Sequence, residues 1–222
     1  MIELRTAWRS ALLLPILVLP LAGCNYLAAA ASMTPVYQDP KYKGLTNQSV
    51  GVMVWADRGV SIDWPDIQLD TAGSIQNKLQ LTQKAKAKEL SGTTWPVLPQ
   101  SIVRYQRDHP EIEAYPIADT APKLGVTRLV YVEIQEFRTR SEAAVELYRG
   151  AMSANIKILE IADGHATVGY EEDGIRVVFP KNSKAEGSLE GEDVQIYAGL
   201  LDAFSDAFCE RLVRHEVEDE DN

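Results

Sequence analysis

Acidic side chains gather just after the first predicted strand, where they could hold a hard cation. Asp57, Asp63, Asp66 and Asp70 lie close together in the sequence, and carboxylate oxygens are the ligands that Ca²⁺ and Mg²⁺ prefer. The four residues lack the alternating Asp-x-Asp-x-Asp-Gly spacing of a calcium-binding loop. Loop polarity and helix capping explain them better, so we expect no metal site here.

Other catalytic and cofactor-binding patterns are missing from the sequence. His109, His165 and His215 fall in a predicted loop, hairpin turn and terminal tail, without metal-ligand spacing. The chain has no G-x-S-x-G elbow and no P-loop. We therefore expect no catalytic residue, no metal and no cofactor, and a protein that is not an enzyme. The alternative is a hydrolase that uses carboxylates from the loops after the strands.

Three tryptophans are candidates for a partner-binding surface. Trp55 and Trp64 bracket the loop after the first predicted strand, and Trp95 follows the first long helical segment. Together with Tyr105 and Tyr115 they could rim a binding surface, because large aromatic side chains are enriched at binding hot spots. The competing interpretation is that these rings fill the core and its edges.

The amino-terminal segment has the pattern of an export signal. Arg5 and Arg9 precede a short apolar run, and Leu21-Ala22-Gly23-Cys24 follows it. The run is too short to span a bilayer, which takes about 20 apolar residues, whereas a basic start, a short apolar core and small residues at its end are typical of a secretory signal. The alternative is an ordinary signal peptide in which Cys24 is incidental.

Residues 21–24 resemble the lipobox of bacterial lipoproteins. The resemblance implies cleavage before Cys24, with diacylglycerol on its sulfur and an acyl group such as palmitate on its new amino group. Two or more acyl chains give stable membrane anchoring. Asn25 follows the cysteine, where an Asp favours the inner membrane in enterobacteria, so we expect the outer membrane, with the domain facing the periplasm.

Composition limits the partners of the chain. The formal net charge is −10 over 222 residues, and loss of residues 1–23, with Arg5, Arg9 and Glu3, would make it −11. This balance disfavours nucleic acid, whose phosphates require Lys and Arg, and it gives no attraction to anionic lipid. Cys24 and Cys209 are the only cysteines. A lipidated Cys24 therefore excludes an intramolecular disulfide.

The order of the predicted elements indicates an α/β (α+β) fold: a mixed sheet with a long antiparallel hairpin and helices packed on it. We expect a signal peptide over 1–23, a lipid anchor and tether over 24–47, one α/β domain over 48–215 and an acidic disordered tail over 216–222. The alternative for the tether is a helical turn packed on the domain. The expected elements are strands at 48–55 and 128–134, an edge strand at 95–99, a hairpin of 146–161 and 166–179 around Asp163-Gly164-His165, and helices at 65–90 and 193–214.

The body of the chain resembles an envelope domain shared by the amino-terminal part of the Tol-Pal translocation protein, the curli secretion lipoprotein and lipoprotein activators of cell-wall synthases. Residues 50–54 and 124–134 carry this resemblance, as a first strand and as a Gly-containing turn leading into a strand. It implies a non-catalytic module that binds an envelope protein. We therefore expect a membrane-anchored binding or assembly module. The alternatives are a lipid-anchored hydrolase that uses loop carboxylates and a subunit of a secretion assembly.

Overall fold

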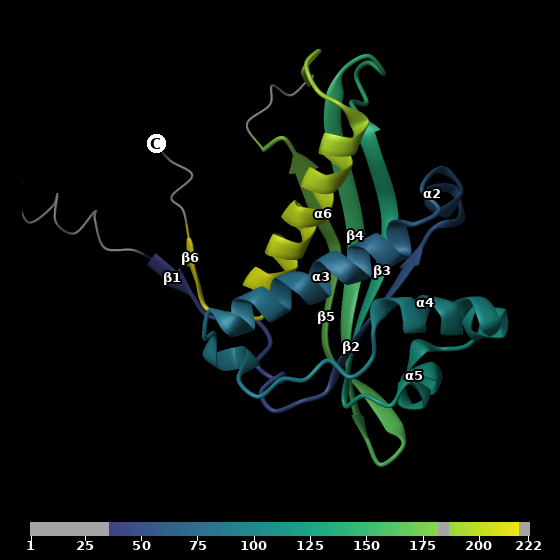
Figure 1. Cartoon of the computed structure of the whole chain (residues 1–222), viewed down its shortest axis with the longest axis vertical. Coiled ribbons are helices and arrows are strands. Elements are labelled where there is room, and N and C mark those ends of the chain that lie inside the picture. Colours follow the sequence, from purple (N-terminus) through teal and green to yellow (C-terminus); the bar gives the residue numbers. More distant parts are fainter. Residues whose placement is uncertain (1–35, 182–186, 218–222) are drawn as a thin grey trace, which may run out of the picture. The chain divides into compact units, whose positions relative to one another are not determined.

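The computed structural model describes residues 36–181 and 187–217 (Figure 1). The chain divides into two compact units, of which the larger runs from Asp39 to His215. The described residues of the smaller unit are 36–38 and 216–217. Strands β1 (Val36–Gln38) and β6 (His215–Val217) form a two-stranded sheet.

The larger unit is built on a four-stranded mixed sheet with the order β2-β3-β4-β5. Strand β2 (Val50–Ala56) is parallel to β3 (Arg128–Arg140), which is antiparallel to β4 (Tyr148–Ala162), and β4 forms a long hairpin with β5 (His165–Phe179). Asp163 and Gly164 both have positive φ in the hairpin turn, the conformation that tight hairpins favour. The α/β class, the mixed sheet and the hairpin are confirmed.

Helical segments connect and cover the strands. The α-helices are α2 (Arg58–Asp63), α3 (Ile67–Lys84), α4 (Pro99–Asp108), α5 (Ile117–Thr120) and α6 (Asp193–Glu210). The described residues also form the 3₁₀ turns η1 (Lys88–Leu90), η2 (Pro110–Ala114) and η3 (Ala121–Leu124). Helices α3 and α6 cross the strands in Figure 1. No helix among the described residues is long and apolar enough to cross a membrane.

Side-chain alternation along the strands separates two apolar clusters. On one face, Val52 and Val54 of β2 pack with α3 and α6 through residues such as Ile75 and Phe204. On the other face, Met53 packs with α4, η2 and η3 in a second cluster. The second cluster is lined by Met53, Ile102, Ile112, Ala121, Leu124, Val126, Leu129, Tyr131 and Leu159.

The second face carries polar side chains beyond this cluster. Glu133 of β3 is opposite Asn155 of β4, and Lys157 of β4 is opposite Glu171 of β5. Glu133, Asn155 and Lys157 are partly exposed. This part of the sheet face is therefore polar and partly exposed to solvent.

The domain begins earlier than the sequence predicts. Tyr42 and Leu45 are 7% and 2% exposed in the first cluster, and the Tyr42 hydroxyl donates to Glu160 Oε1 at 2.8 Å. Residues 39–47, expected in the tether, thus belong to the domain, because two apolar side chains among polar ones anchor them. At the other end, Glu216 and Val217, expected in a disordered tail, lie in β6. Residues 1–35 and 218–222 lie outside the described residues.

Candidate functional site

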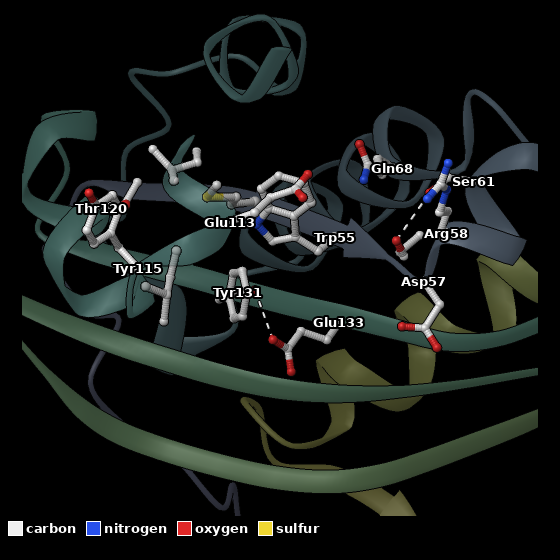
Figure 2. A pocket seen from close by; sticks show the side chains of 14 residues that line it. Trp55, Asp57, Arg58, Ser61, Gln68, Glu113, Tyr115, Thr120, Tyr131 and Glu133 are labelled. Carbon is white, nitrogen blue, oxygen red and sulfur yellow. Dashed lines mark hydrogen bonds between the residues drawn. The ribbon is translucent and has the colours of Figure 1, made fainter. Parts of the chain in front are cut away.

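A cavity of about 590 Å³ lies on the second face, where β2 ends and α2 begins (Figure 2). Its volume is in the range of small-molecule sites. Aromatic and charged side chains share its wall, and we call it the acid–aromatic pocket. Its members of these two kinds are Trp55, Asp57, Arg58, Glu113, Tyr115, Tyr131 and Glu133.

The parallel strands β2 and β3 form the floor of the acid–aromatic pocket. Met53 is opposite Tyr131 in the register, and Trp55 is opposite Glu133. Because successive side chains point to opposite faces of a sheet, these four side chains share the second face. Two neighbouring strands thus present two aromatic rings and a carboxylate side by side, as Figure 2 shows.

The segment from η2 to α5 forms another wall. Pro110 begins η2, and the buried Ile112 fixes the turn to the second cluster. Glu113 and Tyr115 follow this anchor in the chain, are exposed and line the pocket. A short irregular segment thereby adds a carboxylate and a phenol to a pocket whose floor is a rigid sheet.

Helix α2 directly follows β2 and borders the pocket there. The Asp57 N–H donates to the Ile134 carbonyl oxygen at 2.9 Å, and the Ser61 hydroxyl donates to the Ala56 carbonyl oxygen at 3.2 Å. These bonds hold the turn on which Asp57 and Arg58 meet the cavity.

The polar groups of the pocket form few bonds with the protein itself. The Tyr131 hydroxyl donates to Glu133 Oε1 at 2.9 Å. Tyr131 is only 8% exposed, and burial, then the carboxylates of Glu133 and Glu113, raises its pKa above the ordinary value. Within residues 36–181 and 187–217, neither Arg58 nor any of the three pocket carboxylates forms an ion pair.

The structure does not bring the three candidate tryptophans together. Trp55 lines the acid–aromatic pocket. Trp64 packs against Phe137 and Tyr197 with ring centroids 5.3 Å apart in each pair, and Trp95 packs against the same first cluster. The sheet separates the last two from Trp55, so a joint Trp55–Trp64–Trp95 surface does not form.

The aspartates after β2 are also dispersed. Asp57 lines the pocket, whereas Asp70 accepts a hydrogen bond from the Tyr197 hydroxyl at 2.7 Å. Asp57 and Asp66 stand at helix N-caps without a side-chain capping bond, so the capping role expected for them is not realised there. Over the described ranges, no group of His, Cys, Asp and Glu side chains is arranged to hold a metal ion.

Sequence reasoning missed the pairing of Tyr131 and Glu133 with Trp55. The usable signal was polarity within a buried strand: Glu133 interrupts the apolar run of β3 at the register position of Trp55. Tyr115 is among the aromatic residues that the sequence favours for a binding surface, whereas Glu113 carried no signal, because the burial of Ile112 is what places the short turn η2.

Cys24 and Cys209 are the two cysteines of the chain. Cys24 lies outside the described residues, so its predicted lipidation stays a prediction. Cys209 is buried on α6, with its sulfur 3.3 Å from Thr82 Oγ1, and burial raises the pKa of its thiol. A buried neutral thiol behaves as a small apolar side chain.

No family model and no curated protein matches the chain. Comparison with solved structures gives neighbours of low sequence identity. The PelC dodecamer from Paraburkholderia phytofirmans is 9% identical, covering 82% of this chain and 99% of that one, with a TM-score of 0.43. Lipoprotein GNA1162 from Neisseria meningitidis is 12% identical, covering 73% of this chain and 96% of that one, with a TM-score of 0.42. The hypothetical protein CT253 from Chlamydia trachomatis is 14% identical, covering 74% of this chain and 96% of that one, with a TM-score of 0.40.

Proposed function

We propose that this chain is a lipoprotein of the bacterial envelope that binds a partner through the acid–aromatic pocket and carries out no catalysis. A lipid on Cys24 holds it to the membrane, and the unit from Asp39 to His215 presents the pocket. The outer membrane, with the domain facing the periplasm, is the proposed location.

The pocket is the single observation that carries the binding role. It combines aromatic walls with carboxylates that form no ion pair within the described ranges, whereas the neighbouring Lys157 and Glu171 on the same face are paired at 3.0 Å. Buried aromatic side chains beside convergent polar groups are the usual composition of a binding site.

The anchor is tested by labelling growing cells with a fatty-acid analogue. Replacing Cys24 by alanine should abolish the label and leave the leader uncleaved, because no sulfur remains to accept diacylglycerol. Cys209→Ala is the matched control and should keep the full label, because that thiol is buried in the domain. Label retained in the Cys24→Ala protein would contradict the anchor.

The location is tested by separating the two membranes on a density gradient. The native chain should sediment with the outer membrane, and Asn25→Asp should shift it toward the inner membrane in an enterobacterial host. Inner-membrane sedimentation of the native chain would contradict the proposed location.

Partner binding is tested by capture from detergent-solubilised membranes with the full-length lipoprotein. A Trp55→Leu variant should lose the partner that the native chain recovers in stoichiometric amount. An exposed charge on α6, changed in Glu210→Gln, provides a control that should retain it. Equal recovery by all three proteins would place the binding site elsewhere.

A hydrolase remains the second candidate, because Asp57, Glu113 and Glu133 line one cavity. Glycoside cleavage requires two carboxylates across a cleft. Incubation with purified peptidoglycan should release no reducing ends if the binding role is correct. Release that disappears in both Glu113→Gln and Glu133→Gln would support the hydrolase instead.

A further inference from the structure

We propose that the acid–aromatic pocket binds a basic side chain, lysine or arginine, presented by the partner protein. This inference rests on the proposed function and names the chemistry that the pocket selects.

The charge of the pocket favours a cation. Three carboxylates, on Asp57, Glu113 and Glu133, line the cavity, whereas Arg58 supplies one guanidinium to the same lining. Glu133 Oε1 accepts the Tyr131 hydroxyl, while none of the described residues donates to Glu133 Oε2. A carboxylate held in place with an open acceptor is arranged for a charge-assisted hydrogen bond from a ligand cation.

The aromatic rings favour an organic cation over a metal ion. Trp55 and Tyr131 occupy neighbouring strands on the same face, and Figure 2 shows both rings beside the carboxylates. An ammonium or guanidinium group is attracted to the face of such rings, most strongly to Trp. The carboxylates of the described residues are not grouped tightly enough to hold a metal ion.

The size and the surroundings of the pocket fit a side chain with an apolar stem. The cavity of about 590 Å³ is far larger than a bare ion needs, and Met53 and Ile112 supply apolar wall for methylene groups. The formal net charge of −10 draws cations toward the molecule as a whole. A lysine or arginine side chain of a partner fits the negative charge, the aromatic rings and the size of the pocket.

The test follows the indole N–H resonances of the full-length lipoprotein in detergent during titration with short peptides. Acetyl-Ala-Lys-Ala-amide and acetyl-Ala-Arg-Ala-amide should shift the Trp55 resonance in a saturable way. Trp64 and Trp95 are internal controls, because they pack on the opposite face of the sheet. The peptide with Gln or Glu at the central position should leave all three resonances unmoved.

Variants separate the charge from the aromatic contribution. Isothermal titration calorimetry measures the variants, because it does not depend on the Trp55 resonance. Glu133→Gln and Trp55→Leu should each weaken the binding of the basic peptides by about tenfold, and Trp55→Phe should recover part of the loss. Glu210→Gln makes the same charge change on α6 and should have no effect. Added salt should weaken binding in the native protein.

The outcomes distinguish the ligand class from the binding role. If the Gln peptide binds as well as the basic ones, or no peptide shifts Trp55, the cation assignment is overturned. A Trp55-dependent capture of a membrane partner would still leave the proposed function standing in either case. Putrescine, a free diamine, tests the other source of an ammonium group. If it binds more tightly than the Lys peptide, the proposal that the cation comes from a protein side chain is overturned.

Discussion

Glu172 accepts several ionic hydrogen bonds from other described residues. Arg211 donates to both of its oxygens, from Nε at 3.0 Å and from Nη2 at 2.7 Å, Lys41 Nζ donates at 3.0 Å, and the Tyr170 hydroxyl donates as well. Burial alone would raise the pKa of the Glu172 carboxyl, but these donors outweigh it and lower the pKa to about 2. Glu172 therefore joins β5, the end of α6 and the start of the domain through its ionised form.

Replacing Glu172 by glutamine should lower the free energy of unfolding by about 1–3 kcal/mol at neutral pH. A carboxyl with a folded pKa below its unfolded value stabilises the fold above the unfolded pKa, and this contribution is lost as pH falls from about 4.5 toward 2. The gap between native and variant, measured by urea denaturation, should therefore shrink across that window. Glu210→Gln should show no gap, and a pH-independent gap would contradict an ionic role for Glu172.

The site could be predicted only in part from its residues. The sequence predicts Trp55 as a binding residue and Asp57 as a polar loop residue, but it gives no sign that the two share one site. Their meeting depends on the register of β2 with β3, which places Glu133 opposite Trp55, and on the burial of Ile112, which brings in η2. Neither the strand register nor the burial of Ile112 can be predicted from sequence spacing, because both depend on contacts between residues far apart in the chain.

At the scale of elements, two glycines show opposite demands of helix and strand. Gly73 lies inside α3, and Gly174 lies in β5 with φ of 67° where the register with β4 shifts. An added Cβ would meet no atom within 4 Å at either position. Gly73→Ala should therefore raise the free energy of unfolding by about 0.5–1 kcal/mol, and Gly174→Ala should lower it by about 1 kcal/mol. Urea denaturation of both variants checks the pair, and the same sign for both would contradict this account.

The elements of the fold differ in how well the sequence predicts them. The hairpin turn at Asp163-Gly164 is predicted correctly from the sequence, because tight hairpin turns have local residue preferences. The expected edge strand at 95–99 is wrong: Thr94 forms an isolated bridge to Ser49, and Pro99 begins α4. Pro96 and Pro99 have no N–H to donate to a ladder, so an apolar segment there packs without pairing.

At the scale of the larger unit, residues 39–47 close one end of the sheet and should be needed for its stability. Leu45 and Tyr42 pack in the first cluster, Arg128 Nε donates to the Tyr42 hydroxyl at 3.0 Å, and the Lys41 N–H donates to the Arg211 carbonyl oxygen at 2.8 Å. A fragment of residues 39–215 should therefore unfold cooperatively in urea. A fragment of residues 48–215, the boundary expected from the sequence, should lose at least about 4 kcal/mol of unfolding free energy, because removing a buried Leu and a buried Tyr each costs about 2–5 kcal/mol. Leu45→Ala in the longer fragment should show about half of that loss, and equal stability of the two fragments would mean that the burial of residues 39–47 contributes nothing to the fold.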